Sequence, residues 1–101
     1  GAATDKALGA YYWSRGTREG FFVGGNLPAL QEGQVFQVWL MTGDGAIPIA
    51  AFKSSDGSGQ AYMDLAALKQ RPEGIGVSVE SAAGAAQPTG DLVLFAAMPS
   101  R

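Results

Sequence analysis

Residues 34–45, which read QVFQVWLMTGDG, form the most apolar run in the chain. Alternate side chains of a strand point to opposite faces. One face would therefore carry Phe36, Val38 and Leu40, and the other would carry Val35, Gln37, Trp39 and Met41. Because both faces are mostly apolar, the run is predicted to be a central strand that is covered on both sides. The Gly-Asp-Gly that ends it is a hairpin signal.

Two residues of this run need an explanation. A buried amide without hydrogen-bond partners costs about 1–3 kcal/mol, so Gln37 is predicted to bind a loop backbone or an acid. The alternative is a partly covered face on which the amide meets water. Trp39 is predicted to be a core anchor, because aromatic side chains bury the largest areas.

Further strand patterns occur on both sides of this run, separated by glycine-rich turns. They lie at residues 8–14, 21–25, 46–53, 60–65, 75–81 and 91–97. With 34–42, this makes about seven short strands, the number and spacing typical of a sandwich. The chain, residues 1–101, is therefore predicted to be a single all-β domain, an antiparallel β-sandwich with Ig-like or Greek-key connections. Residues 66–74 could form one helical turn before Pro72 ends it.

Composition excludes several function classes. The chain of 101 residues has a net charge of −2 and scattered Lys and Arg, so no nucleic-acid-binding surface is expected. It contains no His and no Cys, which excludes disulfides, thiolate or imidazole metal sites and His-based triads. We expect no metal, no cofactor and no catalytic residue, and hence no enzyme.

The acidic residues agree with this expectation, because most of them lie in predicted turns, where Asp is favoured for local hydrogen bonding. The turns at 43–45 and 54–59 lack the oxygen ligands of an EF-hand. Glu80 differs, because it ends an alternating strand. It is predicted to accept backbone N–H groups of the 84–90 loop, and the alternative is a ligand-binding carboxylate.

Aromatic residues gather early in the chain, at Tyr11, Tyr12, Trp13, Phe21 and Phe22. Adjacent residues of a strand point to opposite faces, so some of these rings must face outward. Tyr11, Tyr12 and Trp13 are the candidate binding surface, either for sugars or for a protein. The alternative is that these rings complete the sheet. The loop Leu27–Leu30 is predicted to plug the open end of the sandwich or to dock a peptide.

Two blocks of the chain resemble the C-terminal domain of the anti-sigma-K factor family. The first, NLPALQEGQVFQVWLMTGDGAIPIAAF, shows the family's Leu-Pro start, aromatic-Gln-aliphatic-Trp-Leu strand and terminal Phe, carried by Leu27, Pro28, Gly33, Phe36, Gln37, Val38, Trp39, Leu40, Gly45 and Phe52. The second, GVSVESAAGAAQPTGDLVL, resembles the family's valine-containing strand that ends in Glu and its Pro-Thr-Gly turn, with matches at Val77, Val79, Glu80, Gly84, Pro88, Thr89 and Gly90. Ser78, Ser81 and Ala85 depart from that pattern.

The resemblance implies the regulatory or sensor domain of a membrane-anchored anti-sigma factor. Such a protein holds an extracytoplasmic-function sigma factor with a cytoplasmic segment, which one transmembrane helix connects to this domain outside. A site-specific protease then releases the sigma factor. Since the chain starts at Gly1, the anchor is expected upstream of it. The alternative function is a carbohydrate- or protein-binding sandwich module of another envelope protein.

Overall fold

The fold consists of seven β-strands. They are β1 (Leu8–Ser14), β2 (Glu19–Gly25), β3 (Gln34–Thr42), β4 (Gly45–Phe52), β5 (Gly59–Asp64), β6 (Gly74–Ser81) and β7 (Leu92–Ala97). The computed structural model describes residues 8–14, 16, 18–54, 56–65, 72–82, 84, 87–90 and 92–97, and none of these is helical. The predicted strands are confirmed, with ends that shift by two residues at most. The expected helical turn falls mainly on residues outside the described ones.

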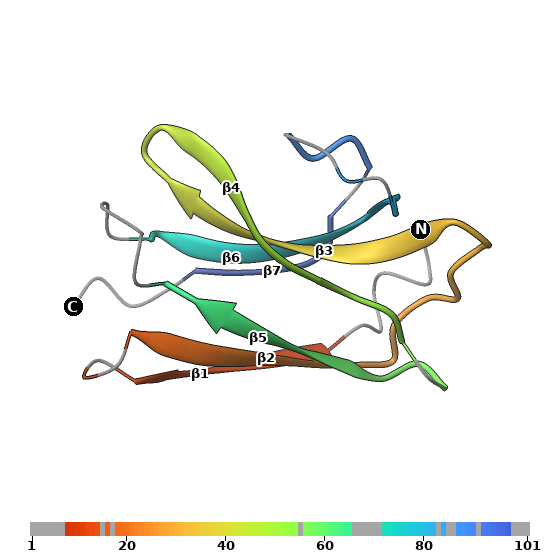
Figure 1. Ribbon diagram of the computed structural model, residues 1–101, viewed down its shortest axis with the longest axis horizontal. Coiled ribbons are helices and arrows are strands. Elements are labelled where there is room, and N and C mark those ends of the chain that lie inside the picture. The colour runs from red at the N-terminus through yellow and green to blue at the C-terminus, as the bar shows by residue number, and fades with distance from the viewer. Residues whose placement is uncertain are drawn as a thin grey trace.

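The strands form two antiparallel sheets that pack face to face (Figure 1). One sheet has the order β1-β2-β5 and the other has the order β4-β3-β6-β7. Strands that are not consecutive in the sequence lie side by side in both sheets, at β2-β5 and at β3-β6, so the chain crosses repeatedly from one layer to the other. This arrangement confirms the predicted antiparallel sandwich with Greek-key connections.

The connection between β3 and β4 is a tight hairpin, as the Gly-Asp-Gly signal predicted. Thr42 pairs with Gly45, which leaves a two-residue loop. The Thr42 hydroxyl accepts the N–H of Asp44 and donates to the carbonyl of Gly45, both at 3.2 Å. Gly45 has φ of +128°, a backbone conformation that favours glycine.

The core lies between the two sheets and takes alternate residues from each strand. β3 contributes Phe36, Val38 and Leu40, all fully buried. The ring of Phe52 bridges the layers, with its centroid 5.9 Å from Phe22 on the three-stranded sheet and 5.3 Å from Phe36 on its own. Burial of these side chains supplies most of the driving force for folding.

β3 is also covered on its other side. Of its nine residues, Phe36 to Leu40 are all buried, although only every second one can face the core. Gln37 and Trp39 therefore lie buried on the outer face of the four-stranded sheet. The prediction of a central strand covered on both faces is confirmed.

Candidate functional site

The most elaborate polar arrangement in the described part of the chain is centred on Glu80. This carboxylate is 2% exposed, near the end of β6 on the outer face of its sheet. Its Oε2 accepts hydrogen bonds from Ser78 Oγ at 2.5 Å, from the Thr89 N–H at 3.0 Å and from the Gly90 N–H at 3.4 Å. Its Oε1 accepts the Thr89 hydroxyl. Glu80 thus fixes the connection that follows its strand, as predicted from the sequence.

Ser78 extends this cluster to Trp39 on the neighbouring strand. The Ser78 hydroxyl donates to Glu80 and accepts the Trp39 indole N–H at 2.8 Å. Both residues are fully buried. Trp39 is therefore a buried anchor, as predicted, but it lies on the outer face and outside the inter-sheet core cluster. Its polar N–H explains the location, because a buried indole needs an acceptor.

Two opposing effects act on the acidity of Glu80. Burial raises the pKa of a carboxyl, because it disfavours the charged form. The hydrogen bonds from Ser78, Thr89 and Gly90 stabilise that form and together hold the pKa of Glu80 below its ordinary value. The side chain is consequently a carboxylate at neutral pH, and its acceptor capacity is taken up by the protein itself.

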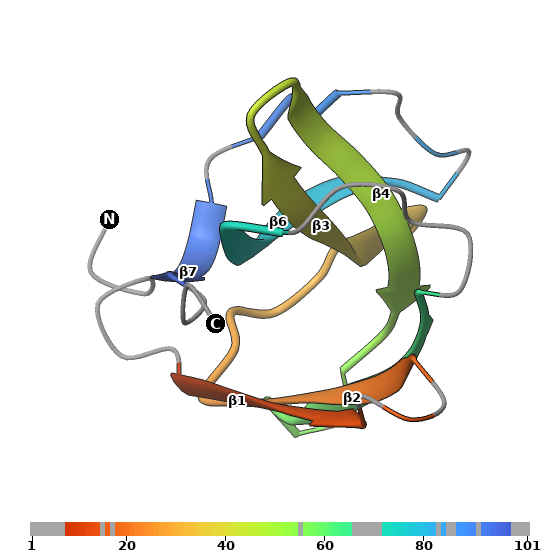
Figure 2. The same ribbon diagram turned by 90° about the vertical axis from the view of Figure 1, so that its left-hand side faces the viewer.

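Residues 87–90, in the connection between β6 and β7, lie on this side of the sheet. Figure 2 shows them above β3 and β6, on the side away from the three-stranded sheet. A Cβ atom built on Gly90 would lie 2.7 Å from the carbonyl oxygen of Val79. Only glycine allows the connection to approach β6 so closely at this point. The Pro-Thr-Gly stretch is thus a structural latch on Glu80.

Gln37 has a structural role as well, but with another partner than predicted. It is 7% exposed, and its amide donates to the carbonyl of Ala50 in β4 at 2.8 Å. The acceptor is a strand carbonyl rather than a loop or an acid, so that part of the prediction is wrong. The reason is a β-bulge, in which Val38 pairs with Ala50 and Trp39 with Pro48. A bulge disrupts the ladder locally, and the amide supplies a donor there.

The other family-motif residues between positions 27 and 52 form part of the core and close one end of the sandwich. Leu27, Phe36, Leu40 and Phe52 are buried in the core cluster. Pro28 is half-buried, and so is Pro88 in the other block. The Leu27 N–H donates to the Gly57 carbonyl at 2.9 Å, which joins two loops. Leu30 also packs against the core, so the Leu27–Leu30 loop plugs the end of the sandwich.

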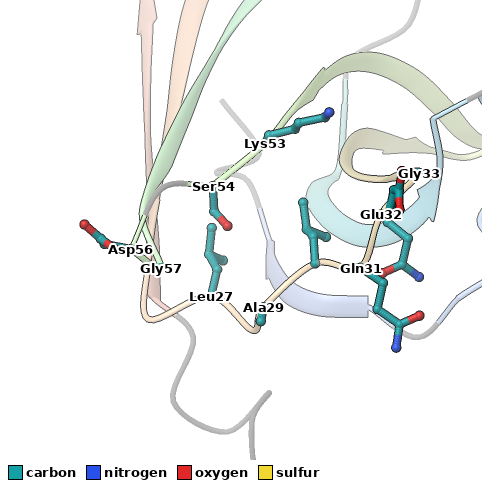
Figure 3. A pocket seen from close by; sticks show the side chains of 11 residues that line it. Leu27, Ala29, Gln31, Glu32, Gly33, Lys53, Ser54, Asp56 and Gly57 are labelled. Atoms are coloured by element: carbon teal, nitrogen blue, oxygen red, sulfur yellow. Dashed lines mark hydrogen bonds between the residues drawn. The ribbon is translucent and has the colours of Figure 1, made fainter.

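An open hollow of about 490 Å³ lies between these two loops. Leu27 and Leu30 line it, together with the exposed charged residues Glu32, Lys53 and Asp56. Figure 3 shows that the Asp56 carboxylate points away from the hollow. The charges are of both signs and do not converge on one point, so the hollow lacks the few precisely placed polar groups of a ligand site.

The three aromatic residues predicted to form one binding surface do not share a face in the structure. Tyr11 is half-buried and packs against the core, whereas Tyr12 is exposed on the outer face of the three-stranded sheet. The backbone of Trp13 pairs with Gly20, but its side chain lies outside the described part of the chain. Tyr12 instead lies in register with Phe21, and Phe21 with Tyr62. The sequence pattern did not connect Tyr62 with this row, because the pairing of β2 with β5 is long-range.

The described residues provide neither a metal-binding cluster of acidic side chains nor a helix that could span a membrane.

Comparison with protein families identifies the family of the chain. The family model described as "Anti-sigma-K factor rskA, C-terminal" matches residues 2–92, which include six complete strands and the whole Glu80 latch. No curated protein and no solved structure matches the chain.

Proposed function

Because the chain belongs to the anti-sigma-K factor rskA C-terminal family, we propose that it is the extracytoplasmic sensor domain of a membrane-anchored anti-sigma factor. The parent protein would hold an extracytoplasmic-function sigma factor and release it through regulated proteolysis. The observation that carries the proposal is the match of this regulatory family over residues 2–92. We propose further that residues 1–101 form one domain, since all described strands share one core.

The site geometry supports a regulatory rather than a catalytic role. Glu80 is the most buried carboxylate described, and its four hydrogen bonds are all made within the protein: three come from Thr89 and Gly90 in the β6–β7 connection and one from Ser78 in β6. A general acid or base must instead reach a substrate proton. The motif residues Leu27, Phe36, Leu40 and Phe52 are core residues. The family pattern therefore maintains a stable fold, as a domain that guards a cleavage site requires.

The complete gene would distinguish this function from that of another envelope-binding module. A transmembrane segment just upstream, preceded by a sigma-binding segment, would support the proposal. A complete reading frame without either of these would contradict it.

The substitution Trp39→Ala tests whether folding of the domain gates proteolysis. Truncation of a buried Trp costs about 3–5 kcal/mol, which raises the open population by about a hundredfold to a few thousandfold. Proteolysis of a transiently opened chain follows that population. In cells that carry the full-length variant, we expect a reporter for the cognate sigma factor to rise without an external signal.

The matched control is Lys53→Ala, which changes an exposed side chain and should leave the reporter at its basal level. The isolated Trp39→Ala domain must also be shown to be less stable than the wild type. An unchanged reporter with a destabilised domain would mean that folding does not gate proteolysis.

A further inference from the structure

The outer face of the three-stranded sheet carries a continuous row of exposed aromatic side chains. Tyr12, Phe21 and Tyr62 occupy directly opposed positions on β1, β2 and β5, and they are 63%, 49% and 47% exposed. Val23, two residues along β2, is exposed beside them. These four residues, called here the aromatic row, include most of the large exposed apolar side chains described. Contiguous exposed apolar surface of this kind marks interaction sites.

The ring geometry distinguishes between two kinds of ligand. The rings of Phe21 and Tyr62 meet edge to face, with centroids 5.7 Å apart and planes at 68°. Sugar rings stack on aromatic faces, and a platform for a glycan chain needs several such faces turned the same way. The edge-to-face pair does not provide that platform. It does form a corrugated apolar surface, which suits the packing of side chains from another protein.

The charges next to the aromatic row are negative. Glu19 and Asp64 oppose each other on β2 and β5, two positions further along the strands from Phe21 and Tyr62 and so on the same face. The Tyr62 hydroxyl donates to Glu19; this bond, with the neighbouring carboxylates, raises the pKa of Tyr62, which stays neutral. Among described residues, the strands of this face carry no Lys or Arg, and Arg18 lies in the β1–β2 turn, directly before Glu19.

From this combination we propose that the aromatic row, with Glu19 and Asp64, is a docking surface for a polypeptide that presents lysine or arginine among apolar side chains. Its apolar residues would cover Val23 and Phe21. Its cations would lie against the two carboxylates and over the exposed faces of Tyr12 and Tyr62, which attract cations through their π-systems. The proposal rests on this surface and holds whether or not the parent protein is an anti-sigma factor.

The test uses two defined peptides as probes. One is Ac-Lys-Phe-Lys-Val-Lys-Phe-Lys-NH₂, and the other has Glu in place of every Lys. In a titration of the ¹⁵N-labelled domain, we expect the lysine peptide to shift amides of β1, β2 and β5. The glutamate peptide should bind about tenfold more weakly or worse, because like charges then face each other. Binding of the lysine peptide should weaken with added salt.

Three variants separate the contributions. Phe21→Thr removes the central ring but keeps a strand-forming residue, and Glu19→Gln removes one charge without a change in size. Each should weaken binding of the lysine peptide severalfold. Phe95→Thr is the control, since Phe95 is also an exposed ring, at 59%, but lies on β7 of the other sheet. It should bind like the wild type. If Phe21→Thr does not fold, the proposal is still tested by the binding of the lysine peptide to Glu19→Gln and by the salt dependence of its binding to the wild type.

Several outcomes would overturn the proposal. One is equal binding of the two peptides, and another is a set of shifts confined to the four-stranded sheet. Cellohexaose that binds this face more tightly than the lysine peptide would identify a glycan site instead. Concentration-dependent dimerisation in sedimentation velocity that Phe21→Thr abolishes would show that a second copy of the chain covers the face. None of these results bears on the sigma-factor reporter, so the two proposals fail separately.

Discussion

Replacement of Glu80 by Gln tests the latch most directly. The substitution keeps the length of the side chain, but it removes the charge and replaces one acceptor oxygen by an NH₂ group. Ser78, Thr89 and Gly90 together donate four hydrogen bonds to the carboxylate. A hydrogen bond to a charged group contributes about 1.5–3 kcal/mol. These contributions do not add, and Gln is less costly to bury, so we expect a net loss of roughly 2–4 kcal/mol.

The pH dependence of this loss follows from the lowered pKa of Glu80. A carboxyl whose pKa is lower in the folded than in the unfolded state stabilises the fold fully above its unfolded pKa, which is about 4.3 for Glu. That stabilisation is lost as the pH falls through the folded pKa, because the carboxyl then takes up a proton. The wild type and Glu80→Gln should therefore differ at pH 7 and converge in strong acid.

Urea unfolding followed by tryptophan fluorescence measures both effects. With a slope of about 2 kcal/mol per molar urea, which is usual for a small domain, the midpoint of Glu80→Gln at pH 7 should fall by about 1–2 M. The amides of Thr89 and Gly90 should also exchange hydrogen faster. Glu73→Gln is the matched control, since Glu73 is exposed just before β6. Stabilities within about 0.5 kcal/mol at pH 7, or a difference that persists unchanged in acid, would refute the reasoning.

Two further substitutions test local features of the same sheet. Gln37→Leu should lower the thermal midpoint by several degrees, since it leaves the Ala50 carbonyl without its donor at a cost of about 1–3 kcal/mol; an unchanged or higher midpoint would mean that the amide is dispensable at the bulge. Gly90→Ala should destabilise the domain because its Cβ would lie 2.7 Å from the Val79 carbonyl oxygen, whereas Gly25→Ala meets open space and should be tolerated. Equal effects of the two glycine substitutions in urea unfolding would contradict the close approach.

The sequence predicted the features that depend on local patterns. Alternation identified the strands, and the apolar character of both faces of residues 34–42 placed β3 in the middle of its sheet. The Gly-Asp-Gly signal located the hairpin, and its last glycine, Gly45, takes the positive φ that follows the two loop residues. Glu80 could be assigned to the following loop because both ends of that interaction lie within ten residues of the chain.

The features that depend on long-range register could not be predicted. One extra residue in β4 shifts the pairing between Val38 and Trp39, and this shift decides that Gln37 meets a strand carbonyl. Tyr62 lies in one row with Tyr12 and Phe21 only because β5 pairs with β2. In the sequence, these two strands are separated by β3 and β4, which belong to the other sheet. In the sequence, Ser78 stands out only as a departure from the family pattern, whereas in the structure its hydroxyl connects Trp39 with Glu80.

The two outer faces of the sandwich differ, because the chain covers one with its own residues and leaves aromatic side chains exposed on the other. This difference offers a way for partner binding at one face to change the stability of the whole domain. On the four-stranded sheet, the chain uses Ser78, Glu80 and Thr89 to hold its own connection over a buried Trp39. On the three-stranded sheet, Tyr12, Phe21 and Tyr62 stay exposed. A partner bound only to the folded state would stabilise that state by mass action. Loss of the Glu80 latch raises the population of open, unfolded molecules. A partner docked on the aromatic row would lower that same population, although the two surfaces do not touch.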